Sequence, residues 1–213
     1  MLEGVRAGSP GPALAAVVLA GGRAARLGGA DKPALVVGGQ PLLASVVQAA
    51  VGAGASQVII VGPPRPGLDA GAAASPASLT WVREDPPGSG PVAALRCGLA
   101  GVTAPLTLLL AADLPFLRAR QLTALLQATG EPAPGEGAVL VDDAGWPQWL
   151  VGCWVTAALR TGLASYQGRS LHGLLEPLRP ARLSWVPAAG EPPPWLDCDT
   201  SGDLRRAQSW SRP

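Results

Sequence analysis

Surplus charge is the first thing that this sequence lacks. Its 213 residues hold 16 lysines and arginines against 15 aspartates and glutamates, so the formal net charge is only +1. A protein that binds DNA or RNA over its surface needs a basic face or a high isoelectric point, and the pI here is near 7.8. We therefore expect no nucleic-acid partner, and any binding of phosphate groups has to be local.

Cysteine and long apolar runs are also scarce. The three cysteines are far apart and form no CxxC pair, which argues against a disulfide framework and against a zinc site. The longest apolar runs fall far short of the ~20 residues that span a bilayer. The first residues lack the charged and apolar regions of a signal peptide. We therefore expect a cytoplasmic protein without membrane contact, with packing roles for Cys97, Cys153 and Cys198.

Asparagine is absent, and lysine occurs once, as Lys32. We interpret this as a bias of the coding sequence, so an arginine or aspartate here can stand where another chain has lysine or asparagine. The one ammonium group lies in a glycine-rich loop that follows an apolar run over residues 14–20. Such a run predicts a buried strand, and the loop after it is where open α/β sheets bind ligands.

Apolar segments of strand and helix length alternate along the first half of the chain. Besides residues 14–20, we predict strands over residues 57–61, 79–82, 105–112, 138–141, 149–154, 182–186 and, last and shortest, 195–199. We predict helices over residues 42–51, 92–99, 118–128, 155–163, 170–176 and 202–210, the last of them N-capped by Thr200. This pattern is typical of an α/β fold, with three αβα layers around a doubly wound, mostly parallel sheet. We expect a single domain over residues 14–213 after a disordered tail, residues 1–13.

Two common phosphate-binding loops fail to match the segment around Lys32. The Walker pattern needs Lys-Ser or Lys-Thr after its last glycine, and the dinucleotide pattern needs GxGxxG, whereas Gly21 and Gly22 are adjacent here. What remains is a loop whose glycine amides can approach phosphate oxygens and whose arginine and lysine side chains can neutralise them. Taken alone, such a loop is also compatible with an ordinary turn.

Four blocks of the sequence resemble, in order and spacing, the nucleotidyltransferases with a nucleotide-diphospho-sugar-transferase fold. Within them, the molybdenum cofactor guanylyltransferase branch is the most similar. The first block is Leu19-Ala20-Gly21-Gly22, Arg26-Leu27-Gly28 and Asp31-Lys32. The second is Asp85 followed by Gly90-Pro91-Val92-Ala93-Ala94-Leu95, and the third is Leu110-Ala111-Ala112-Asp113-Leu114-Pro115-Phe116. The fourth is Asp197-Cys198-Asp199-Thr200 with Asp203-Leu204. The blocks span residues 14–207.

The resemblance implies a site and a reaction, in which GMP passes from GTP to the phosphate of a molybdopterin-type cofactor and pyrophosphate leaves. Catalytic roles fall to Lys32, Arg26 and Asp113. Nucleotide-binding roles fall to Leu19, Ala20, Gly21, Gly22, Lys32, Asp85 and Asp113. Mg²⁺ would be held by Asp113 and Asp199, since this ion is bound through one or two carboxylates plus substrate oxygens. Contact with molybdoenzymes or with other cofactor-biosynthesis proteins is a further implication.

Several of these residues have a second interpretation. Asp113 precedes Leu-Pro and could be a turn residue, and Asp199 could instead cap the last helix. His172, the only histidine, is expected to be a helix residue rather than a base. Trp146, Trp149 and Trp154 could line an acceptor pocket or belong to the core.

The fourth block departs from the family, because Ser201 and Gly202 replace its proline and glutamate. That departure leaves open a catalytically silent nucleotide-binding module with the same fold. A related transferase that uses CTP or another triphosphate and a different phosphorylated acceptor is a second alternative, because the sequence by itself does not name the acceptor.

Overall fold

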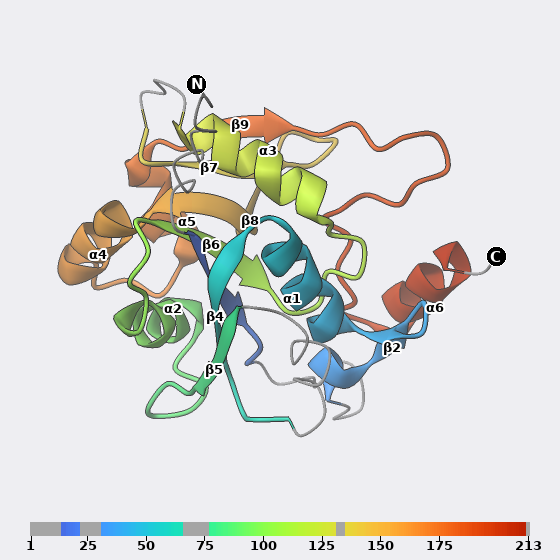
Figure 1. Ribbon diagram of the computed structural model, residues 1–213, viewed down its shortest axis with the longest axis horizontal. Coiled ribbons are helices and arrows are strands. Elements are labelled where there is room, and N and C mark those ends of the chain that lie inside the picture. Colours follow the sequence, from blue (N-terminus) through green and yellow to red (C-terminus); the bar gives the residue numbers. More distant parts are fainter. Residues whose placement is uncertain (1–13, 22–30, 66–76, 131–134, 212–213) are drawn as a thin grey trace, which may run out of the picture.

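The computed structural model describes residues 14–21, 31–65, 77–130 and 135–211. Its main feature is a seven-stranded sheet with the order β5-β4-β1-β6-β8-β7-β9 (Figure 1). The strands are β1 (Leu14–Leu19), β4 (Ala55–Val61), β5 (Ser78–Val82), β6 (Leu106–Ala111), β7 (Gly137–Val141), β8 (Pro147–Val155) and β9 (Ala181–Ser184). β8 is antiparallel to β6 and β7, and every other neighbouring pair is parallel. The predicted α/β fold with a mostly parallel sheet is confirmed.

Helices cover both faces of the sheet (Figure 1). α1 (Leu42–Gly52) and α3 (Ala119–Gly130) pack on one face, while α2 (Pro91–Ala100), α4 (Thr156–Ser165) and α5 (Leu171–Leu175) pack on the other. β1 belongs to both cores because alternate side chains of a strand point to opposite faces. Ala16 and Val18 join the core with α1, and Ala15 and Val17 join the core with α2. Since both faces are covered, the strand is apolar throughout. This is why a buried strand could be predicted here from the sequence.

A small hairpin between β1 and α1 was not predicted from the sequence. A 3₁₀ turn, η2 (Lys32–Ala34), leads into β2 (Val36–Val37) and the antiparallel β3 (Gln40–Pro41). The two-residue turn is formed by Gly38 and Gly39, both at positive φ (59° and 80°), which glycine adopts without steric cost. The last helix, α6 (Ser201–Trp210), lies beside this hairpin (Figure 1). A small apolar cluster joins them: Val37, Leu42, Phe116, Cys198 and Ala207.

The prediction of a last strand over residues 195–199 is wrong. This segment adopts turns and extended chain outside the sheet. Prolines at 192, 193 and 194 precede it, and proline has no amide hydrogen to give to a strand ladder. Its apolar residue, Cys198, is buried in the small cluster under α6 instead of in the sheet. The segment therefore serves to bring Asp199 to the start of α6.

The remaining predicted elements are present, with ends that differ by a few residues. The predicted tail, residues 1–13, lies outside the described residues. Within the part of the chain that the structure describes, no helix has the length and apolar character needed to cross a membrane.

Candidate active site

The site forms beside β1, where the order in which strands are added to the sheet changes direction. β4 lies on one side of β1 and β6 on the other, and all three strands are parallel. After β1 the chain continues to β4 on one side, whereas after β6 it continues to the strands on the other side. Open α/β sheets bind ligands at such a switch point, outside the carboxyl ends of the strands. β1 continues into Ala20 and Gly21, and β6 continues into Ala112 and Asp113. The Ala112 amide still donates to the Leu19 carbonyl at 3.1 Å, so the two ends are held together.

Lys32 and two aspartates meet at this edge. The Lys32 ammonium lies between Asp113 Oδ2 and Asp199 Oδ1 and forms an ion pair with each. The side chains of Lys32 and Asp113 are 17% and 18% exposed, and that of Asp199 is 51% exposed. Three segments that are far apart in the chain thus place their charged groups at one point. The structure brings together three of the residues predicted for the site.

Negative charge exceeds positive charge around this lysine. Burial by itself lowers the pKa of Lys32, but the charges and hydrogen bonds of Asp113 and Asp199 outweigh it and raise that pKa. Asp197 is a third carboxyl group nearby. Burial first, and then the charges of Asp199 and Asp113, raise its pKa. A site with one fixed cation and several carboxylates favours a further cation.

A cavity of about 280 Å³ opens beside the ends of β1, β4 and β5. We call it the edge cavity, and its described lining is Ala20, Gly21, Gly62, Pro63, Arg65, Arg83, Glu84, Pro87 and Gly88. Glycine is required at 62 because a Cβ there would lie 2.9 Å from the backbone of Ala20. Gly21 borders the cavity without a side chain to fill it. Gly21 and Gly88 are exposed and have no side chains, so a ligand can closely approach the backbone at these two points of the wall.

One arginine ties the edge of this cavity to the lysine segment. Arg65 Nε donates to both carboxylate oxygens of Asp31, at 2.8 and 2.7 Å. Its other nitrogens donate to the Pro63 carbonyl at 3.1 Å and the Ala20 carbonyl at 3.2 Å. The side chain is only 11% exposed. Arg65 therefore connects the ends of β1 and β4 to the residue that precedes Lys32.

Known proteins match this chain over nearly all of its length. Residues 16–183 match the family described as the MobA-like NTP transferase domain. The chain belongs to this family. The transferase is 30% identical over 210 residues to a molybdenum cofactor guanylyltransferase of Bradyrhizobium sp. (strain ORS 278), and the match covers 92% of each chain.

Two solved structures illustrate the shared fold. A molybdopterin-guanine dinucleotide biosynthesis protein A from Archaeoglobus fulgidus superposes with a TM-score of 0.64 at 19% identity, covering 92% of the transferase and 97% of that chain. A 2-C-methyl-D-erythritol 4-phosphate cytidylyltransferase from Thermus thermophilus also gives 0.64, at 18% identity, covering 93% and 98%. At these identities, the two likenesses show the fold alone.

The carboxylates of the transferase fit a magnesium ion better than a zinc ion. Asp113 Oδ1 is buried and has no hydrogen-bond partner among the described residues, so one oxygen of this carboxylate is free to bind a cation. Within those residues, no group of three or more histidine, cysteine, aspartate or glutamate side chains could hold a metal. Closed zinc sites need such a set, whereas Mg²⁺ takes one or two carboxylates and completes its shell with water and substrate oxygens.

The residue that caps α6 is Thr200. Its side chain accepts a hydrogen bond from the Asp203 amide at 3.2 Å, and the Asp203 carboxylate accepts from the Thr200 amide at 2.8 Å. This reciprocal pair is a capping box, and the predicted cap at Thr200 is confirmed. Thr200, and not Asp199, is therefore the N-cap of α6. The Asp199 carboxylate turns to Lys32 instead.

Not every predicted site residue lies at this point. Gly22 and Arg26 fall outside the described residues. Leu19 is buried, and Ala20 and Gly21 border the edge cavity. Asp85 is exposed and is not among the described residues that line the cavity, whereas its neighbour Glu84 is.

The three tryptophans in β8 and directly before it lie in different environments. Trp154 is fully buried in the core. Trp149 packs against the ring of His172, with centroids 5.5 Å apart. Trp146 is 70% exposed. The three tryptophans therefore do not form one pocket wall.

The cysteines of the transferase behave as packing residues. Burial raises the pKa of Cys153 to about 11 and that of Cys198 to about 12. Both are fully buried. Neither thiol is available as a thiolate near neutral pH.

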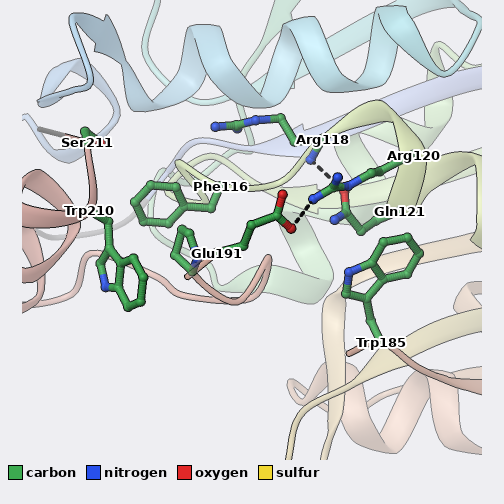
Figure 2. A pocket seen from close by; sticks show the side chains of 9 residues that line it. Phe116, Arg118, Arg120, Gln121, Trp185, Glu191, Trp210 and Ser211 are labelled. Carbon is green, nitrogen blue, oxygen red and sulfur yellow. Dashed lines mark hydrogen bonds and ion pairs between the residues drawn. The ribbon is translucent and has the colours of Figure 1, made fainter. Parts of the chain in front are cut away.

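A second cavity, of about 230 Å³, lies near the carboxyl end of α6 (Figure 2). Its charged groups are already partnered. Glu191 accepts from Arg120 at 2.5 Å, and the Arg120 guanidinium also lies over the ring of Trp185 at 5.9 Å. Arg118 donates to the carbonyls of Pro115 and Leu117, at 2.7 and 3.0 Å. These contacts join the start of α3 to the segment after β9. They account for the positions of Arg118 and Arg120, so no ligand is needed to explain these two side chains.

Replacing Arg65 with alanine is expected to weaken nucleotide binding and stability together. The carbonyls of Ala20 and Pro63 would lose a donor, and Asp31 would lose its charge partner, at a cost of about 1–3 kcal/mol in unfolding free energy. Thermal unfolding and GTP titration measure both effects. The matched control is Arg182→Ala, because the Arg182–Glu176 pair is about half exposed (51% and 42%). Such pairs contribute at most about 1 kcal/mol. Equal effects of the two variants would contradict the role given to Arg65.

Proposed function

We propose that the protein moves GMP from GTP onto the phosphate of a molybdopterin-type molybdenum cofactor in the cytoplasm, and releases pyrophosphate. The observation that carries this proposal is the meeting of Lys32, Asp113 and Asp199 at the carboxyl end of β6, next to β1, whose continuation at Ala20 and Gly21 lines the edge cavity. The identity to a named guanylyltransferase supports the choice of guanine and acceptor. GTP and the cofactor are then the small-molecule partners, and contact with molybdoenzymes or other cofactor-biosynthesis proteins is a further expectation.

The chemistry asked of the site is mainly the handling of negative charge. An oxygen of the acceptor phosphate bonds to the α-phosphorus of GTP while the bond from that phosphorus to the β-phosphate bridging oxygen breaks. Both reactants are anionic, so the site has to hold repelling groups in line and neutralise the charge that develops on the leaving pyrophosphate. No general base is required, because a phosphate monoester is already ionised near neutral pH. His172, whose ring packs against Trp149, is therefore given no role as a base.

Each residue of the site has a defined task in this proposal. Asp113 and Asp199 would hold Mg²⁺, which when bound supplies positive charge to the phosphate oxygens. Lys32 adds a fixed ammonium at the same place, and the backbone at Ala20 and Gly21 gives the nucleotide a surface to approach. By the family resemblance, Gly22, Arg26, Leu19 and Asp85 would also serve the nucleotide.

A cytidylyltransferase is the second candidate, since the fold is shared with the Thermus thermophilus enzyme named above. Isothermal titration of GTP, CTP and ATP in the presence of Mg²⁺ separates the two. We expect GTP to bind at least about tenfold more tightly than the others, a difference of ~1.4 kcal/mol. Equal or tighter binding of CTP would overturn the guanine assignment. Failure to bind any triphosphate would overturn the enzymatic proposal as a whole.

A further inference from the structure

Glu84 is the one acidic residue among the described residues that line the edge cavity. It follows β5 by two positions and begins the turn that leads to α2. One carboxylate oxygen, Oε1, accepts a hydrogen bond from the Gly88 amide at 2.9 Å. The other, Oε2, is buried and has no hydrogen-bond partner within the described part of the chain. Glu84 therefore lines the cavity with a carboxylate group, one oxygen of which has no donor in the described chain.

An acceptor of this kind is costly to leave unpaired. Burying a polar atom without a hydrogen bond disfavours the folded state, and native proteins keep such atoms mainly where a ligand, water or ion completes them. The cavity also lies next to Gly21, where a Cβ would stand 3.7 Å from Glu84 Oε1. A ligand that enters beside the bare backbone of Gly21 would thus lie close to the Glu84 carboxylate.

The chemistry of a carboxylate selects among the nucleobases. An ionised glutamate only accepts hydrogen bonds, and each of its oxygens has two lone pairs. Guanine presents two adjacent donors, N1–H and N2–H₂. Cytosine and adenine present one amino donor beside a ring nitrogen that is an acceptor, and this nitrogen would face the carboxylate as a second, repelling acceptor. Three of the five N–H groups of Arg65 already donate to Asp31, Pro63 and Ala20.

We propose that Glu84, rather than its neighbour Asp85, selects guanine by accepting hydrogen bonds from the N1–H and N2–H₂ groups of the base. This proposal rests on the function proposed above and adds its specificity-determining residue. Asp85 is exposed and is not among the described residues that line the cavity, whereas Glu84 is. Glu84 meets the base with Oε2 and keeps the turn in place with Oε1.

The competing interpretation is that Glu84 only shapes the turn over residues 84–88. Glu84→Gln separates the two roles, because the amide oxygen of glutamine can still accept from the Gly88 amide. Its NH₂ group replaces the second oxygen and opposes the donors of guanine. We therefore expect this variant to fold with an unchanged melting temperature and with altered base selectivity.

The experiment is isothermal titration of GTP, ITP and CTP, each with Mg²⁺, against the wild type and three variants. ITP lacks the 2-amino group of guanine and so removes one of the two donors. The variants are Glu84→Gln, Asp85→Asn and the control Glu136→Gln, whose exposed side chain lies directly before β7, the strand next to the opposite edge of the sheet. We expect Glu84→Gln to lower the affinity for GTP about 10- to 100-fold. We expect the preference for GTP over ITP to fall towards one, while CTP binding and the control stay unchanged.

Each other result counts against the proposal. An equal loss for all three nucleotides would show a structural role only, and an unchanged preference for GTP would show that Glu84 does not contact the base. Loss of guanine preference in Asp85→Asn alone would assign the role to the neighbour. In those three cases the wild type still prefers GTP, so the proposed function stands. A wild type that binds CTP as tightly as GTP would instead overturn the function and this inference together.

Discussion

Replacing Asp113 with asparagine is expected to reduce turnover at least about 10³-fold while leaving the fold intact. That loss corresponds to ~4 kcal/mol in the activation free energy at 1.36 kcal/mol per factor of ten. The asparagine keeps the shape of the side chain, but it removes the negative charge that would hold Mg²⁺ at the end of β6. Losses of this size are typical when a group that stabilises developing charge is removed. Pyrophosphate release at saturating GTP and Mg²⁺ measures the effect.

The same variant should be at least as stable as the wild type. Lys32 pairs with Asp113 and Asp199, and Asp197 is a third carboxyl group nearby, whose pKa is raised by burial first and then by the charges of Asp199 and Asp113. Like charges gathered in this way repel one another. Removing one charge relieves that repulsion, so the melting temperature is expected to stay constant or rise, as at other sites where function costs stability. Glu136→Gln serves as the control for loss of a negative charge. A large loss of stability with full activity would contradict the role of Asp113.

Replacing Lys32 with methionine is expected to lower kcat/KM for GTP by about 10²- to 10³-fold, or ~3–4 kcal/mol. Methionine keeps much of the length of the stem but has no ammonium, so the triphosphate loses a fixed positive charge. Asp113 and Asp199 also lose the cation that lies between them. Steady-state kinetics with varied GTP measure the first effect.

Magnesium provides a second measurement on the Lys32 variant. In the wild type the ammonium competes with Mg²⁺ for the two carboxylates, whereas in Lys32→Met the ion would be their only strong partner. We therefore expect Mg²⁺ to raise the melting temperature more in the variant than in the wild type, and a chelator to cancel the rise. If kinetics and magnesium response both match the wild type, Lys32 has no place at the centre of the site. Lys32→Arg tests whether charge alone suffices, since arginine and lysine differ in shape and hydration.

The sequence predicts best those parts of the fold that are determined by burial. β1 is apolar throughout and β6 is apolar except for the buried Thr107, because helices cover both of their faces, so the positions of these strands in the chain could be inferred directly. The short hairpin of β2 and β3 could not, since strands of two residues have no periodicity to detect. The segment over residues 195–199 shows the opposite error. Its alternating residues resemble a strand, but the preceding prolines and the small cluster under α6 determine its conformation.

Only those residues of the site that lie in recognisable sequence blocks could be predicted. Lys32, Asp113 and Asp199 could be named from the family blocks, and the structure adds that they meet. Arg65 could not be found, because it lies in a proline- and glycine-rich stretch whose sequence has no pattern, and its partners depend on tertiary contacts. Glu84 and Asp85 are adjacent carboxylates, and only the path of the turn decides which of them lies against the edge cavity.

The central claim is the transfer of GMP to a pterin phosphate. The most direct measurement follows a label on the α-phosphorus of GTP into the product. The wild type is incubated with Mg²⁺, the molybdopterin-type cofactor and GTP labelled at its α-phosphorus. The account predicts that the label enters a guanine dinucleotide of the cofactor, with one pyrophosphate released for each label transferred, and that CTP does not replace GTP. Label transfer from CTP in preference to GTP, or no transfer to the cofactor from any triphosphate, would contradict it.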